Sequence, residues 1–259
     1  MEFDNNLLLE SIKTGLIDKN VESDISWHPK IITNNYEAKE KVLTTIESLL
    51  EECDEFFFNV AFVTKSGVIS ILNTLEKIER AGTKGKILIS KYQNFSDPNA
   101  LRMLLKFSNI NLRIIDENNF HAKGFLFKLE KNYELIIGSS NLTQDALSKN
   151  TEYNLKLSLA KNSNLLSQAL SVFEKYFLKG YQVDEDFLKE YSLIFDEFNS
   201  LNLKKYNIAS KISPKLKPNK MQRVALENLR NLRNANIKKA LLISATATGK
   251  TYLSAFDVK

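Results

Sequence analysis

Two residues of types that suit phosphoryl transfer stand close together in the middle of the chain. His121 and Lys123 lie in a run of alternating character, 120–127. In a strand, alternate residues share one face, so the imidazole and the ammonium are expected on the same side. Two residues of strand rise span about 6.6 Å, which lets one phosphate contact both groups.

A second run adds groups that bind and orient an anion. Residues 133–138 form a largely apolar stretch, typical of a buried strand, which ends in the small-residue sequence Gly-Ser-Ser-Asn at 138–141. Small residues at a strand end let backbone N–H groups and short donors such as Ser139 and Asn141 approach an anion closely. A carboxylate follows at Glu152, where a third alternating run begins.

At these residues the sequence resembles the phospholipase D superfamily, whose signature is HxK followed by a GSxN turn. The pattern stands here as His121-Ala122-Lys123 and as Gly-Ser-Ser-Asn at 138–141. One departure is that the family's usual Asp, five positions after the Lys, is Lys128. The resemblance covers roughly residues 1–180 and implies a mixed α/β sheet flanked by helices on both faces.

The resemblance also implies a two-step mechanism without a metal. His121 would attack the phosphorus of a phosphodiester and form a phosphohistidine. Lys123, Asn141 and Ser139 would stabilise the charge on the non-bridging oxygens, and Glu152 would orient the imidazole. The chemistry needs two histidines, one as nucleophile and one as acid. Because the chain has one HxK, a homodimer with a shared active site is expected.

Composition narrows the class of protein. The 259 residues are 43% hydrophobic and 26% charged, with a net charge of +5, which suits a globular protein and fits DNA as a partner. One cysteine, Cys53, excludes an internal disulfide, and two histidines exclude a multi-histidine metal site. Without an export signal or a long apolar run, we expect a cytoplasmic protein that does not bind membranes.

The periodicity of apolar residues predicts strands alternating with helices, as in a largely parallel or mixed sheet that is covered on both faces. The predicted strands are 56–63, 86–90, 112–115, 120–127, 133–138 and 152–159. The predicted helices are a short one at 7–12, then 35–53, 67–81, one that begins at Asp97-Pro98, 163–178 and 184–202.

The C-terminal part has a different pattern. A basic, proline-containing linker is expected at 211–218, followed by a helix from Met221 and a strand at 240–243. This strand runs into a small-residue loop that ends in Gly-Lys-Thr. A strand, such a loop and Gly-Lys-Thr together indicate a phosphate-binding P-loop.

This part resembles superfamily 2 helicases of the DEAD/DEAH type. Gln222 stands where that family places an adenine-reading glutamine. Thr248, Gly249, Lys250 and Thr251 correspond to the Walker A motif, with Lys250 for the phosphates and Thr251 for Mg²⁺. The resemblance implies a parent protein that uses ATP and Mg, cut inside its RecA-like motor lobe.

We therefore expect a phospholipase D-like nuclease domain over 1–180, a helical extension over 181–210, a linker over 211–218 and the truncated start of a helicase lobe over 219–259. The function expected is that of a phosphodiesterase or endonuclease in a DNA helicase or restriction-type translocase. The main alternative is a catalytically silent DNA-docking module for the motor. A lipid phosphodiesterase is less favoured, because nothing resembles a membrane-binding helix. His28 is expected to be a packed or capping residue.

Overall fold

The computed structural model describes residues 5–37, 39–91, 96–117, 119–212, 218–243 and 250–257. The chain divides into two compact units, Met1–Leu201 and Asn202–Lys259. In the described ranges, no helix combines the length and the apolar character that crossing a bilayer requires.

Within its described residues, the first unit is built on one eight-stranded mixed sheet with the order β1-β7-β6-β5-β2-β3-β4-β8. Strands β2, β3 and β4 run parallel, and all other neighbours are antiparallel. The strands are β1 (Lys30–Ile32), β2 (Glu55–Val60), β3 (Lys84–Ser90), β4 (Ile110–Ile115), β5 (Gly124–Lys128), β6 (Asn132–Gly138), β7 (Asn154–Ala160) and β8 (Tyr181–Gln182).

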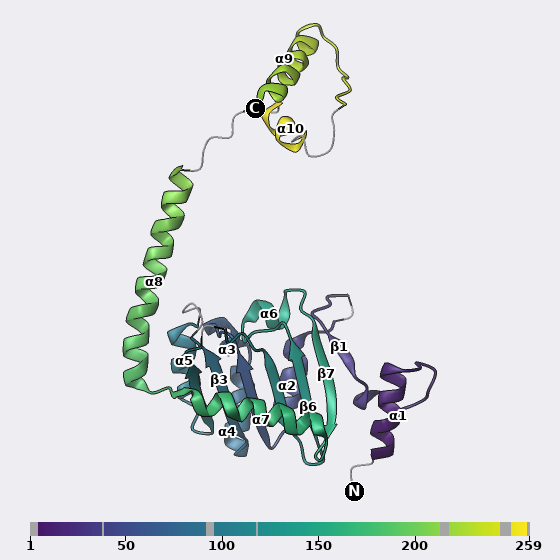
Figure 1. Cartoon of the computed structure of the whole chain (residues 1–259), viewed down its shortest axis with the longest axis vertical. Helices are drawn as coiled ribbons and strands as arrows, with labels where there is room; N and C mark the ends of the chain where they lie inside the picture. Colours follow the sequence, from purple (N-terminus) through teal and green to yellow (C-terminus); the bar gives the residue numbers. More distant parts are fainter. Residues whose placement is uncertain are drawn as a thin grey trace. The chain divides into compact units, whose positions relative to one another are not determined.

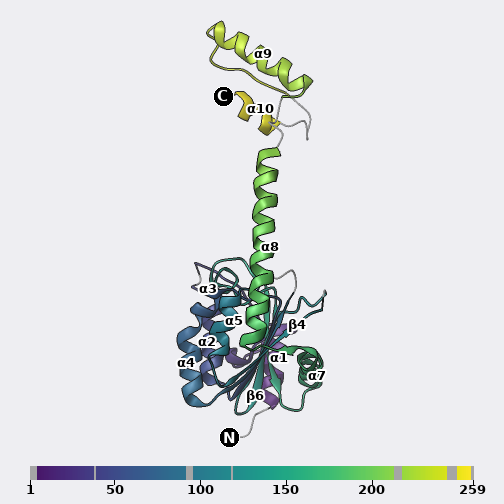
Figure 2. The same ribbon diagram turned by 90° about the vertical axis from the view of Figure 1, so that its left-hand side faces the viewer.

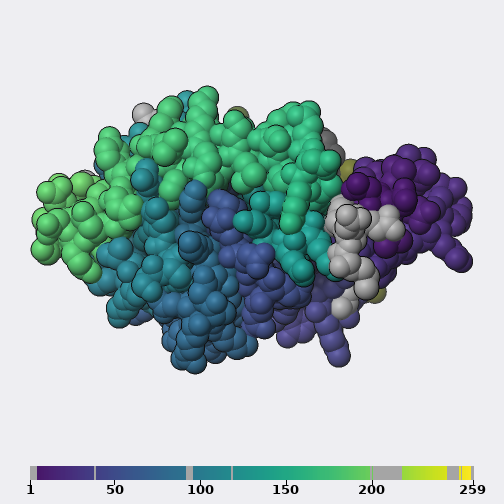
Figure 3. All heavy atoms as spheres, turned by 90° about the horizontal axis from the view of Figure 1, so that it is seen from below, coloured from purple at the N-terminus to yellow at the C-terminus, as the bar shows by residue number. Residues whose placement is uncertain are grey.

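Helices cover both faces of this sheet, which confirms the predicted fold class of the domain. Figure 2 shows α2, α3, α4 and α5 on one face and α7 on the other. In the space-filling view from below, green residues lie on one side and blue residues on the other, while the N-terminal residues in purple gather at one end (Figure 3). The helices of this part are α1 (Asn5–Leu16), the 3-10 helix η1 (Ile25–Trp27), α2 (Val42–Glu52), α3 (Lys65–Ser70), α4 (Leu72–Ala81), α5 (Pro98–Leu105), α6 (Gln144–Ser148), α7 (Asn164–Lys179) and α8 (Glu185–Ile212).

The run of phenylalanines in β2 explains why this strand is central. Phe56 and Phe58 are fully buried on the face covered by α2 to α5, whereas Phe57 is buried on the face covered by α7. The ring of Phe58 packs edge-on against Phe125 of β5, with 4.9 Å between centroids, and Phe57 does the same with Phe173 of α7. A strand buried on both sides needs such an uninterrupted apolar run.

Several helix starts follow from capping side chains. Asp97 accepts a hydrogen bond from the N–H of Asn99 and precedes Pro98, so α5 begins where the sequence predicts. Thr143 caps α6 and Ser163 caps α7 in the same way. These caps fix the directions in which the chain leaves the ends of the strands.

Several predicted helices differ from the structure, and the one expected over 184–202 continues in α8 to Ile212, inside the predicted linker. The helix expected over 35–53 begins only at Val42, because the Asn34 carboxamide accepts the Val42 N–H and a β-bridge joins Asn35 to Glu40. The helix expected over 67–81 is divided at Ile71 into α3 and α4.

The polar face of β7 is buried, although the sequence suggests a face open to the site. The Lys156 ammonium lies 2.5 Å from Glu134 Oε2, and both side chains are less than 10% exposed. Ser158 and Asn132 donate to the other carboxylate oxygen at 2.6 and 2.8 Å. Glu134 Oε2 has no aligned hydrogen bond among the described residues, so its burial is compensated by the ion pair alone.

The second unit contains α9 (Lys220–Asn234) and α10 (Lys250–Asp257), which pack through Leu226 and Leu253 and pair Arg233 with Asp257. The strand predicted at 240–243 is not formed: these residues are irregular and exposed. A strand needs a neighbouring strand for its backbone hydrogen bonds, and the described residues of this unit provide none.

Candidate active site

His121 and Lys123 lie at the edge of the sheet where the parallel strands end. β5 begins only at Gly124, which is paired with Asn59 near the end of β2, so the HxK residues precede the strand that was predicted to contain them. Their side chains nevertheless meet. The Lys123 ammonium is 2.9 Å from His121 Nδ1 and 3.0 Å from the His121 carbonyl oxygen.

The Gly-Ser-Ser-Asn turn follows β6 at the same edge. A Cβ at Gly138 would lie 2.2 Å from the carbonyl oxygen of Tyr153, so only glycine allows the turn to approach the start of β7. Ser140 is held by Asn154, which accepts from its N–H at 3.3 Å and donates to its hydroxyl at 2.9 Å. The turn is therefore fixed before any ligand binds.

Asn141 connects this turn to β2. Its side chain is buried, and its Oδ1 accepts the N–H groups of Ala61 and Phe62 at 3.1 and 3.3 Å. The described residues supply no acceptor for its Nδ2, which remains able to donate to an anion.

Ser139 and Glu152 form the other side of the site. The Ser139 hydroxyl donates to Glu152 Oε2 and accepts the N–H of Tyr153 at 3.0 Å. Burial lowers the pKa of Lys123, while the negative charge of Glu152 acts in the opposite direction. The electric field of Glu152 therefore reaches Lys123. Lys123 in turn contacts His121, and Glu152 accepts a hydrogen bond from Ser139, so the four side chains are linked.

Two asparagines of the site were not assigned a role from the sequence. Asn154 locks the turn, and Asn59 Oδ1 lies so close to Gly124 that a Cβ there would be 2.7 Å from it. The only sequence signal for Asn59 was a polar residue inside an apolar strand. Asn154 is harder to recognise from the sequence as a site residue, because it is one of several polar residues in a strand that alternates polar and apolar positions.

The remaining candidates lie elsewhere. His28 Nε2 is 2.7 Å from the Ser23 hydroxyl and caps η1, so it is packed as expected. Cys53 is buried, and burial raises its pKa to about 12. Among the described residues, no group of three or more His, Cys, Asp or Glu side chains is arranged to hold a metal ion.

Of the nucleotide-binding candidates, Gln222 is used structurally: its side chain accepts the Asn219 N–H in a capping box at the start of α9. Lys250 and Thr251 open α10. Thr248 and Gly249 lie outside the described residues, as does most of the predicted linker. The structure therefore places the five candidate residues for phosphodiester cleavage at one end of the strands. The assignment of the nucleotide-binding residues stays a prediction.

Residues 55–177 match the family model described as "Cardiolipin synthase, PLD-like domain". This part of the chain is therefore similar in sequence to a PLD-like domain. The matched range includes all five candidate residues of this site. The family resemblance of the domain is thereby confirmed, whereas its attachment to a helicase stays a prediction.

Solved structures similar to this chain include NucT from Helicobacter pylori, at 17% identity and a TM-score of 0.48 over 60% of this chain and 98% of that one. Nuc, a phospholipase D family member from Salmonella typhimurium, matches at 18% identity and a TM-score of 0.47, over 61% of this chain and 100% of that one. Phosphatidylserine synthase from Haemophilus influenzae Rd KW20 matches at 13% identity and a TM-score of 0.48, over 69% of this chain and 46% of that one. No curated protein sequence matches the chain.

Proposed function

We propose that the phospholipase D-like domain is a metal-independent phosphodiesterase of the nuclease type that acts on DNA through a phosphohistidine. The observation that carries this proposal is the contact between His121 and Lys123, beside the Ser139–Glu152 pair. A nucleophile, a cation and an orienting carboxylate then lie within reach of one phosphate.

In the first step, a ring nitrogen of His121 attacks the phosphorus, a P–N bond forms and the P–O bond to the leaving sugar oxygen breaks. The imidazolium of a second histidine gives its proton to that oxygen. In the second step, the same imidazole takes a proton from water, the water oxygen attacks the phosphorus and the P–N bond breaks. His121 is then free for the next turnover.

The neighbouring groups have separate roles in this scheme. The Lys123 ammonium, which rests on the imidazole and the His121 carbonyl, transfers to a non-bridging phosphate oxygen when substrate binds. Asn141 Nδ2 donates to the same phosphate. Ser139 is held by Glu152, so the carboxylate acts on the site through this hydroxyl and through its field on Lys123. A direct contact of Glu152 with the imidazole stays a prediction.

The test is cleavage of single- and double-stranded DNA by the full chain in EDTA. Cleavage supports the proposal. Binding without cleavage would favour the DNA-docking module, and a strict requirement for Mg²⁺ would contradict the mechanism.

The depressed pKa of Lys123 gives a pH prediction. The ammonium form is needed to bind phosphate, so kcat/KM should fall on the alkaline side at a pH below 10.5, the ordinary lysine pKa. In Lys123→Arg the guanidinium stays protonated, and this alkaline limb should move to higher pH. Normalised pH–rate profiles of the two proteins provide the measurement. An alkaline limb at the same pH in both would show that another group titrates.

We also propose that two copies share one active site, as the single HxK requires. An exposed apolar row supports this proposal. Ile31, Leu155 and Ile137 are opposite one another on β1, β7 and β6, and each is at least 39% exposed. The row ends beside Gly138, on the face that α7 crosses (Figure 1). A two-fold contact over this row would bring two copies of His121 to one phosphate.

Mixing subunits tests the shared site. Wild-type protein is allowed to exchange subunits with increasing amounts of His121→Ala protein at constant total concentration. Activity should fall with the square of the wild-type fraction, because a mixed pair retains only one of the two histidines. A linear fall, or an active monomer, would exclude a shared site.

We further propose that residues 219–259 begin a superfamily 2 motor lobe that uses ATP and Mg in a longer parent protein. The start of α10 at Lys250, directly after the predicted loop, agrees with the order of a P-loop. Nucleotide-dependent DNA translocation by the parent protein, lost on Lys250→Ala, is the test of this assignment.

A further inference from the structure

A second basic site lies beside the active site and is formed largely by residues that precede the family match. Its cavity of about 610 Å³ is formed by the turn between β1 and α2 and by the end of α6. We call it the lysine pocket. It is lined by Asn34, Asn35, Tyr36, Lys39, Glu40, Lys41, Thr44, Ser148 and Lys149.

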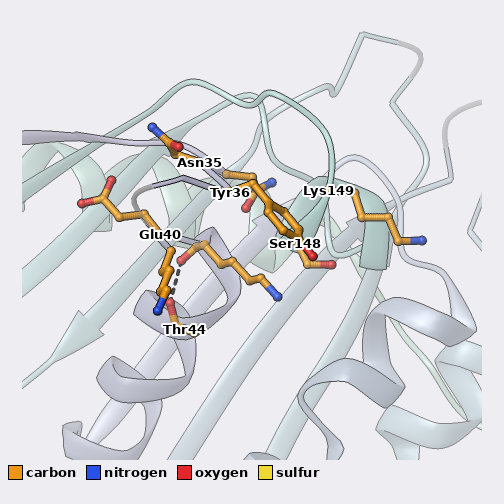
Figure 4. Close-up of a pocket in the computed structure, with 9 residues that line it drawn as sticks. Asn35, Tyr36, Glu40, Thr44, Ser148 and Lys149 are labelled. Atoms are coloured by element: carbon orange, nitrogen blue, oxygen red, sulfur yellow. Dashed lines mark hydrogen bonds between the residues drawn. The ribbon is translucent and has the colours of Figure 1, made fainter.

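Asn34 makes the pocket a built feature. Its Nδ2 donates to the carbonyl oxygens of Ala146 and Asn150 at 2.9 and 2.7 Å, and its Oδ1 accepts the Val42 N–H at 3.0 Å. One side chain thus joins β1, α2 and α6. The Thr44 hydroxyl donates to the carbonyl oxygen of Lys41 at 2.9 Å, as the dashed line in Figure 4 shows.

The charges of the pocket suit an anion. Three lysines face one carboxylate, Glu40, and within the described residues neither Lys39 nor Lys41 has a carboxylate partner. Lys149 pairs with Asp145 at 2.9 Å, but both side chains are more than 60% exposed. Such surface pairs contribute little stability, so a phosphate can compete for this ammonium. In Figure 4, Glu40 and Lys149 point to opposite sides of the pocket.

An aromatic ring accompanies these cations. Tyr36 is 94% exposed, which is unusual for so large a side chain on a turn that hydrogen bonds hold in place. An exposed ring beside lysines is the combination that binds single-stranded nucleic acid, since a base stacks on the ring and phosphates contact the cations. A duplex keeps its bases stacked inside and offers none to Tyr36.

The pocket lies on the edge of the sheet that bears the active site. Ile32 at the end of β1 accepts a hydrogen bond from Asn154, the residue that locks the Gly-Ser-Ser-Asn turn. β1 and β5 are three strand spacings apart, or roughly 14 Å.

We infer that the lysine pocket binds a nucleotide of the single-stranded DNA that flanks the scissile phosphate. Its base stacks on Tyr36, and the adjacent phosphates contact Lys39, Lys41 and Lys149. The choice of DNA rests on the proposed function. The pocket explains how a site with a small catalytic centre holds a long substrate.

The experiment measures binding of fluorescent single-stranded DNA of about 12 nucleotides, and of a dinucleotide, to the full chain at several salt concentrations. The variants are Tyr36→Ala and the double variant Lys41→Gln/Lys149→Gln. The matched control is Lys84→Gln/Lys106→Gln, which removes the same charge at the opposite edge of the sheet, where β3 begins and α5 ends.

We expect Tyr36→Ala to weaken binding of the longer DNA about tenfold, the loss of one stacked base. The lysine double variant should lower the salt slope by about 1.4, as two phosphate contacts of a single strand require. Dinucleotide binding and hydrolysis of bis(p-nitrophenyl) phosphate, which engage the catalytic centre alone, should not change. The control variant should keep the salt slope.

Unchanged binding of the longer DNA, an equal effect of the control variant, or displacement of DNA from the pocket by an acidic peptide of the same length would overturn the inference. The failure of the proposed function has a different signature. A wild-type chain that cleaves neither DNA nor bis(p-nitrophenyl) phosphate, while the pocket variants still weaken binding, would remove the nuclease and retain the pocket.

Discussion

Replacing His121 with alanine should lower the rate of phosphodiester cleavage by about 10⁴-fold or more, because the proposed first step then has no nucleophile. The side chain is exposed and contacts Lys123, so the free energy of unfolding should change by less than about 0.5 kcal/mol. The measurement pairs cleavage in EDTA with a thermal melt. DNA affinity should be largely retained, because Lys123 and the turn at 138–141 remain in place.

His28→Ala is the matched control, since it removes the other histidine of the chain at a position bonded to Ser23. It should leave cleavage unchanged. A trapping experiment adds a direct readout: substrate labelled at the phosphate should leave an acid-labile label on wild-type protein and none on the His121 variant. Cleavage that survives loss of His121 would refute the phosphohistidine mechanism.

Replacing Lys156 with methionine should destabilise the first unit by about 3–5 kcal/mol, because it leaves the Glu134 carboxylate buried without its cation. Trp27, the single tryptophan, lines the same cavity as Glu134 and Lys156, so its fluorescence reports unfolding of this region in urea. The expected result is a large fall in the urea concentration at the midpoint of unfolding, with an unchanged dependence of the unfolding free energy on urea concentration.

Two further variants separate burial from charge. Lys128→Met removes the cation of a partly exposed pair, 3.8 Å from Glu55, and should cost less than about 1 kcal/mol. Glu134→Gln/Lys156→Met keeps an acceptor for Ser158 and Asn132 without a buried charge, and should recover most of the loss. If the single and double variants were equally unstable, lost packing rather than the uncompensated charge would be the cause.

The part of the site that the sequence predicted depended on short-range rules. The spacing of His121 and Lys123 and the small residues at 138–141 are local patterns. The structure places both segments at the same end of the strands, before β5 and after β6. Local patterns do not reveal partners distant in sequence. Asn141 and Ala61 are 80 residues apart, and Asn34 and Asn150 are 116 apart. The anchoring of the turn and the lysine pocket therefore required the fold.

The same limit explains the differences in the fold. Alternation in β7 predicted a strand correctly, but the usual assumption that polar residues face solvent is wrong there, because Glu134 on the neighbouring strand compensates Lys156. The apolar run 240–243 has the composition of a strand, yet strand formation depends on a neighbour that composition does not describe. The very short β1 and β8 carry too few residues for a periodic signal.

Those two short strands have a consequence for the solubility of the domain. β1 covers the open side of β7 with three residues, and β8 covers part of β4 with two. Unpaired strand edges are templates for aggregation, and short terminal strands are one of the ways by which proteins block them. Both lie outside residues 55–177, so a fragment trimmed to the family match would expose β7 and β4. We expect such a fragment to form intermolecular sheets, whereas a fragment that retains residues 30–182 keeps both edges of the sheet capped.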